Sequence, residues 1–123
     1  MSLCILAAGK ITVLVGATFT LSWTHSVEKT RWEEKWRATS AGLQIVEARI
    51  QGSGAGMDPP EGSRFEKGWW VYAPDRKALP RLVLAASGAT GEGWTICDNG
   101  TCMVFGNAAD DPVALRAFNN SIR

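Results

Sequence analysis

Two cysteines near the C-terminal end carry the sharpest chemical signal in the sequence. Cys97 and Cys102 flank residues 98–101, whose centre is Asn99-Gly100. Asn-Gly favours a two-residue β-hairpin turn because both positions accept a positive φ. With that turn, Cys97 faces Cys102 across the hairpin, with Cα atoms about 4.5 Å apart, which suits a disulfide. The spacing therefore predicts a cross-strand disulfide in an oxidising compartment, and the alternative is a pair of reduced thiols packed as small apolar groups.

A metal site at these cysteines is a weaker interpretation, because the chain has only one histidine and one further cysteine. The remaining thiol, Cys4, is expected to be buried and free. We therefore predict no metal site and no cofactor.

His25 is the only histidine, and it stands beside Ser26 and close to Glu28. A Ser-His-acid triad fails on geometry, since adjacent strand residues point to opposite faces. No nucleophile-elbow motif is present. We expect no enzyme here. His25 is interpreted as a hydrogen-bonded structural residue, with ligand contact as the alternative.

A glycine-rich run follows at residues 52–56. Its G-x-G-x-G spacing differs from the dinucleotide fingerprint, and prolines rather than a helix come next. The run is either a tightly turned backbone or a backbone-lined binding loop. A meander of three strands would bring this run and the histidine segment to the same end of a sheet. The candidate ligand- or partner-binding residues are therefore His25, Ser26, Glu28, Gly52, Ser53, Gly54 and Gly56.

Period-two patterns supply the strands of that meander. Residues 18–28 alternate cleanly between apolar and polar, which is typical of a half-buried strand. Residues 31–38 and 43–50 continue the pattern, and strict alternation places Leu43, Ile45 and Glu47 on one face and Val46, Ala48 and Ile50 on the other. Mixed charges on the outer faces can pair across the strands. The adjacent Trp69 and Trp70 should point to opposite faces.

Further strands are expected in an N-terminal hairpin turning at Gly9 and Lys10, and over residues 68–72, 81–86, 94–97 and 101–105. A glycine-rich turn joins the strands at 81–86 and 94–97. Asp110 or Asp111 followed by Pro112 predicts a short C-terminal helix. The predicted fold is all-β: a small sandwich or barrel of about seven to nine short antiparallel strands with that helix.

Length and charge set the broad class. A chain of 123 residues fits a single domain over 1–123, and six tryptophans can build a solid core. The net charge of +1 gives no case for nucleic acid. Lys10 splits the apolar N-terminus, so no membrane-spanning segment is expected. No signal peptide is recognised, which favours the cytoplasm, whereas the cysteine pair favours the periplasm.

Several motifs occur together in one order: residues 23–29 (W-T-H-S-V-E-K), residues 52–57 (G-S-G-A-G-M), Gly68-Trp69-Trp70 and the cysteine hairpin. Over roughly residues 3–105 the chain resembles a bacterial family of unknown function that is encoded beside TAXI-type TRAP transporters. The resemblance implies an accessory role near a solute transporter, with the permease or its solute-binding protein as partner. It brings no catalytic residues.

The first hypothesis is therefore a non-enzymatic accessory or binding domain of such a transport system. The second is a stand-alone β-sandwich that binds a small ligand or carbohydrate through an exposed tryptophan. The third and weakest is a hydrolase with His25 as general base.

Overall fold

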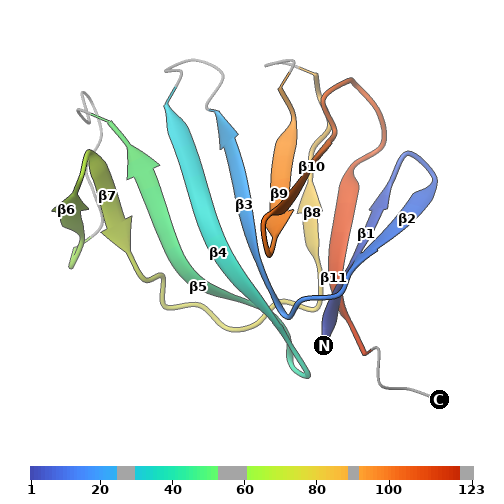
Figure 1. Ribbon diagram of the computed structural model, residues 1–123, viewed down its shortest axis with the longest axis horizontal. Helices are drawn as coiled ribbons and strands as arrows, with labels where there is room; N and C mark the ends of the chain where they lie inside the picture. Colours follow the sequence, from blue (N-terminus) through green and yellow to red (C-terminus); the bar gives the residue numbers. More distant parts are fainter. Residues whose placement is uncertain (25–29, 53–60, 89–91, 120–123) are drawn as a thin grey trace.

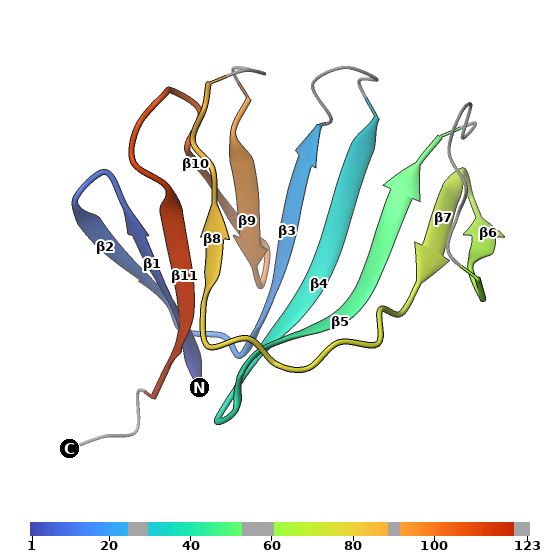
Figure 2. The same cartoon turned by 180° about the vertical axis from the view of Figure 1, so that it is seen from behind.

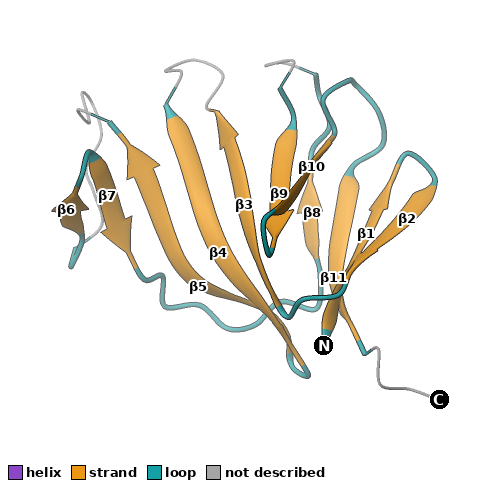
Figure 3. Ribbon diagram, viewed as in Figure 1, coloured by secondary structure: helices purple, strands orange, loops and turns teal. Residues whose placement is uncertain are grey.

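The computed structural model describes residues 1–24, 30–52, 61–88 and 92–119. They form eleven strands and, within these ranges, no helix (Figure 3). The prediction of an all-β, sandwich-like fold is confirmed. The strands are β1 (Ser2–Ala7), β2 (Lys10–Leu14), β3 (Thr18–Thr24), β4 (Arg31–Thr39), β5 (Gly42–Gln51), β6 (Arg64–Glu66), β7 (Trp69–Tyr72), β8 (Leu82–Leu84), β9 (Trp94–Asp98), β10 (Thr101–Phe105) and β11 (Val113–Phe118).

Two antiparallel sheets make up the fold (Figure 1). The smaller has the order β2-β1-β11-β8, and the larger has the order β10-β9-β3-β4-β5-β7-β6. The strands predicted at 81–86 and 94–97 fall in different sheets, as β8 and β9, and residues 89–91 of the glycine-rich turn predicted between them lie outside the described residues.

The prediction of a C-terminal helix is wrong, because residues 113–118 form strand β11. This strand pairs with β1 on one side and β8 on the other, so its backbone groups are hydrogen-bonded within the sheet. Val113 and Leu115 are buried and Arg116 is exposed, which is period-two burial. The Asp-Pro signal read as a helix start instead precedes a central strand.

The predicted meander is confirmed, since β3 pairs with β4 and β4 pairs with β5. The face assignment on β5 is only partly right. The register shifts between Lys35 and Trp36, which face Glu47 and Ile45 and leave Val46 as an extra residue. This β-bulge reverses the alternation, so that Leu43, Ile45, Ala48 and Ile50 are all buried.

One hydrophobic cluster joins the two sheets. The smaller sheet contributes Leu3, Ile5, Leu14, Leu84, Val113 and Leu115, and the larger contributes Phe19, Leu21, Trp36, Ala38, Leu43, Ile45, Ala48 and Ile96. A long connection from β7 to β8 runs past the ends of β5 and β4 (Figure 2). It is anchored by reciprocal backbone hydrogen bonds between Leu43 and Leu79.

The predicted cysteine hairpin is confirmed. Asn99 and Gly100 have φ values of 50° and 87°, and Cys97 lies opposite Cys102. The two residues form a disulfide with a Cα–Cα distance of 4.0 Å, and Cys4 is free and buried, as expected. The bond joins β9 to the edge strand β10.

Candidate functional site

Most of the predicted site lies outside the described residues, namely His25, Ser26, Glu28, Ser53, Gly54 and Gly56. Gly52 is described, and its N–H donates to the carbonyl of Gly68 at 3.1 Å. Thr24 faces Arg31, and Trp32 faces Ile50, so β3 and β5 finish at the same end of the larger sheet. The contribution of the predicted residues to a site stays a prediction.

A row of aromatic side chains crosses the larger sheet at this end, on the face that carries the core. The register places Phe105 opposite Trp94, Trp23 opposite Trp32, and Phe65 opposite Trp70. Ile50 fills the position between Trp32 and Trp70. We call this set the aromatic row: Phe105, Trp94, Trp23, Trp32, Ile50, Trp70 and Phe65.

Ring contacts link neighbours within the row. Trp23 stacks on Trp32 with centroids 5.9 Å apart, and it meets Trp94 at 5.0 Å. Phe65 meets Trp70 at 4.9 Å. Offset and tilted aromatic pairs of this kind contribute about 0.5–1.5 kcal/mol each beyond their area burial. The row is therefore a preorganised apolar strip.

Only part of this row is covered by the smaller sheet. Phe105, Trp94 and Trp23 pack against the shared core. Strands β7 and β6 lie on the side away from the smaller sheet (Figure 1). On these strands Phe65 is 55% exposed and Trp70 is half-buried, and Trp32 on β4 is half-buried as well. We call Trp32, Ile50, Trp70 and Phe65 the aromatic shelf.

Polar side chains lie two residues along the strands from the shelf, on the same face of the sheet. Glu34 faces Ala48, which in turn faces Tyr72. The indole Nε1 of Trp36 donates to Glu34 Oε1 at 2.9 Å. Burial raises the pKa of Glu34, while this hydrogen bond and the charge of Arg76 act in the opposite direction. Burial also raises the pKa of Tyr72, with a further contribution from the negative charge of Glu34, so its phenol stays protonated and can donate.

This carboxyl group gives a pH-dependent prediction. The pKa of Glu34 is raised above 4.5 in the folded protein. At pH values between the unfolded-state and folded-state pKa of this group, the folded protein therefore binds more protons than the unfolded protein does. The free energy of unfolding should therefore fall as pH rises through that window. Glu34→Gln should remove this pH dependence, because the amide does not titrate. At pH values above the folded-state pKa of Glu34, the variant should be more stable than the wild type by up to about 1 kcal/mol, a limit set by the partial solvation of the carboxyl group.

Urea unfolding followed by tryptophan fluorescence between pH 4 and pH 8 measures the effect. Glu61→Gln, which removes the same charge from an exposed turn, is the control. If both variants change the pH profile equally, a specific contribution from Glu34 is excluded.

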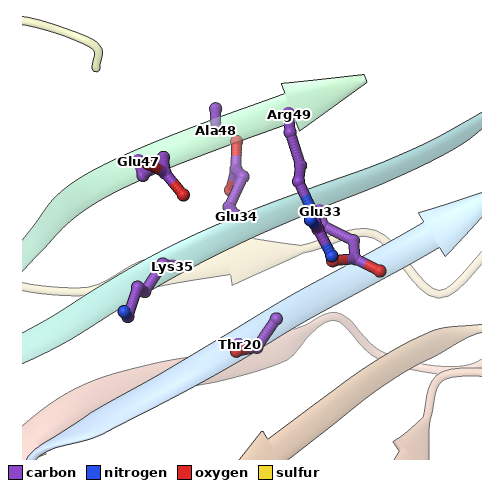
Figure 4. Close-up of a pocket in the computed structure, with 7 residues that line it drawn as sticks. All are labelled: Thr20, Glu33, Glu34, Lys35, Glu47, Ala48 and Arg49. Atoms are coloured by element: carbon purple, nitrogen blue, oxygen red, sulfur yellow. The ribbon is translucent and has the colours of Figure 1, made fainter. Parts of the chain in front are cut away.

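The opposite face of the same sheet carries a charged strip over β3, β4 and β5 (Figure 4). Arg49 donates to Glu33 through Nε and Nη2 at 2.8 and 2.6 Å, and its guanidinium lies 4.5 Å from the ring centroid of Trp69. Arg64 bridges Glu66 and Glu47. The Glu33–Arg49 pair, with Glu33 facing Arg49 across the ladder, confirms the predicted charge pairing between β4 and β5.

A shallow depression of about 210 Å³ opens on this strip. Its lining consists of Thr20, Glu33, Lys35, Glu47 and Arg49 of the strip, together with Glu34 and Ala48, which the register assigns to the core face. Glu33 already pairs with Arg49, which contributes a few tenths to about 1 kcal/mol, and Glu47 pairs with Arg64 beside the depression. We therefore interpret the strip as part of the sheet's own stabilisation.

Trp69 and Trp70 point to opposite faces as predicted, although neither is fully buried. Sequence reasoning did not connect Trp70 with Trp23 and Trp32. The period-two pattern does place each of these tryptophans at an inward position near a strand end. The register that aligns them, however, comes from strand pairing. Among the described residues, no group of three or more His, Cys, Asp or Glu side chains could hold a metal ion.

The fold and this face define the chain as a two-sheet antiparallel β domain with an aromatic surface at one end of its larger sheet. Residues 19–105 match the family described as Domain of unknown function (DUF1850), and the chain belongs to that family. No curated protein and no solved structure matches the chain. No helix among the described residues is long and apolar enough to cross a membrane.

Proposed function

We propose that this chain is a non-enzymatic binding domain that acts as an accessory to a TRAP-type (TAXI) solute transporter, and that the aromatic shelf is its binding surface. The observation that carries the binding role is the extension of the shelf beyond the smaller sheet. There, partly exposed rings from three strands lie in one register.

The chemistry of the shelf suits a solute with an apolar face and polar substituents. Flat aromatic rings pack against apolar surfaces, while Glu34 can accept and Tyr72 can donate hydrogen bonds. Binding sites commonly combine apolar walls with a few placed polar groups in this way. The transporter association rests on the motifs of residues 23–29 and 52–57 and on the resemblance that they carry.

The two adjacent tryptophans of β7 provide a matched test. Trp70→Ala removes a ring of the shelf, whereas Trp69→Ala removes a ring of the same size from the opposite face. We expect Trp70→Ala to weaken binding at least tenfold, because aromatic anchors commonly contribute more than 1 kcal/mol. Trp69→Ala should bind like the wild type.

Two probes separate the partner from the ligand. Purified permease and its solute-binding protein, each immobilised in turn, test the accessory role, and a panel of neutral oligosaccharides tests direct sugar binding. Retention of the wild type by a transporter component, with loss in Trp70→Ala, supports the proposal. Binding to sugars alone favours the stand-alone carbohydrate-binding domain, for which the exposed Phe65 and half-buried Trp70 are the supporting observation. Equal behaviour of the two variants on every probe contradicts a role for the shelf.

A further inference from the structure

The outward face of the smaller sheet is largely apolar, although its inward face already forms the core. Outward positions alternate with the buried Leu3, Ile5 and Leu115. Five large apolar side chains on this face are between 42% and 69% exposed: Leu6, Ile11, Val13, Val83 and Phe118. Leu6 faces Ile11 and Ala114, and Ala114 faces Val83, so one row of apolar side chains runs across all four strands. Contiguous apolar surface of this kind marks an interaction site.

Two arginines stand side by side on the same face. Leu115 faces Leu82, and extending that register by one residue places Arg81 opposite Arg116. Like charges directly opposite on neighbouring strands are destabilising. Neither arginine forms an ion pair with any described residue, whereas Arg31, Arg49 and Arg64 of the larger sheet all pair with glutamates.

The two arginines line one depression of about 210 Å³, together with Cys4, Leu6, Ile11, Ala114 and Leu115. Its volume is below the roughly 300–1,000 Å³ of sites that enclose a small molecule. It can seat an anionic group between the arginines while the rest of the ligand stays outside. No carboxylate belongs to the outward positions of these four strands.

The hydrogen-bonding capacity of this face is concentrated in the arginine pair. The hydroxyl of Ser2, the other polar side chain at an outward position of the paired strands, is buried and donates to the carbonyl of Val15. A protein interface usually carries about one hydrogen bond per 100–200 Å², which this face is poorly equipped to supply. A second copy of the chain would bring four guanidinium groups together. An anionic lipid surface instead offers phosphates for the arginines and an apolar boundary for the aliphatic side chains.

We propose that the outward face of the smaller sheet docks on an anionic phospholipid membrane, with the lipid phosphates between Arg81 and Arg116 and with Leu6, Ile11, Val13 and Val83 at the acyl boundary. This inference is independent of the aromatic shelf, which lies on the other sheet. It adds a membrane surface as a partner for the chain.

Vesicle co-sedimentation tests the inference directly. We expect the wild type to sediment with vesicles of equal parts phosphatidylcholine and phosphatidylglycerol, but not with phosphatidylcholine alone. The double variant R81Q/R116Q should bind the mixed vesicles about 30-fold more weakly, given the contribution of each basic residue near an anionic surface. Ile11→Ser/Val83→Ser should weaken binding while leaving its salt dependence in place.

A charge-matched control separates this site from general attraction. R37Q/K67Q removes two exposed positive charges from the larger sheet and its β6–β7 turn, and it should bind like the wild type. Thermal unfolding of each variant confirms that it is folded. Equal weakening in R37Q/K67Q, or no sedimentation of the wild type with the mixed vesicles, overturns the proposal. So does a dimer in sedimentation velocity that R81Q/R116Q abolishes, because the face would then bind a second copy.

Discussion

Gly42→Ala should lower the free energy of unfolding by about 3 kcal/mol or more. Gly42 has φ of +123°, and a Cβ built there would lie 2.2 Å from the carbonyl oxygen of Leu79. The substitution therefore combines backbone strain of about 1–3 kcal/mol with displacement of a backbone carbonyl. That carbonyl accepts from the N–H of Leu43, and the reciprocal bond runs from Leu79 N–H to the Leu43 carbonyl.

The consequence extends beyond the turn, because Leu79 anchors the long connection that carries the chain from one sheet to the other. Gly9→Ala is the matched control: Gly9 also has a positive φ, but its added Cβ would meet nothing within 4 Å. We expect that variant to lose only the strain energy, about 1 kcal/mol. Urea midpoints at constant m-value measure both changes. Equal losses in the two variants would show that the close approach of Leu79 is unimportant.

Leu3→Ala should cost about 2–5 kcal/mol, the usual range for deleting a fully buried leucine side chain. Leu3 is 0% exposed and faces the shared core from β1, where its strand neighbours are Leu14 and Ala117. Neighbouring backbone is held by pairing on both sides of β1, so the cavity cannot collapse fully.

The same strand supplies the control. Leu6 is three residues further along, on the outward face, and is 47% exposed. Leu6→Ala should cost less than about 1 kcal/mol, because nearly half of the residue is already in water and its truncation removes much less buried apolar surface than Leu3→Ala does. Chemical denaturation of the two variants side by side gives the comparison. A loss at Leu6 as large as that at Leu3 would mean that the outward face is covered in solution.

Local chemistry is sufficient for several elements of this fold. The Asn99-Gly100 turn sets the pairing of its own flanks, so the disulfide follows from the spacing of Cys97 and Cys102. The alternation in β3 needs only one buried face, and it is already visible in residues 18–24. In these places the interactions that select the structure lie within a few residues of one another.

The C-terminal strand shows the limit of such reasoning. Asp-Pro followed by Val113, Leu115 and Phe118 is compatible with a capped helix and with a strand. The choice is made by β1, more than 100 residues earlier in the chain, which pairs with this segment. Likewise, the bulge at Val46 depends on how β5 fits against β4, and no local pattern marks it.

The candidate surfaces also depend on tertiary structure. Alternation and turn chemistry are enough to predict the chain's β character, its central meander and its disulfide hairpin. Only strand register brings Trp23, Trp32 and Trp70 into one row, and only the pairing of β11 with β8 places Arg81 beside Arg116. The physical reason is that side chains on neighbouring strands meet through backbone hydrogen bonds between distant segments, which period-two patterns do not encode.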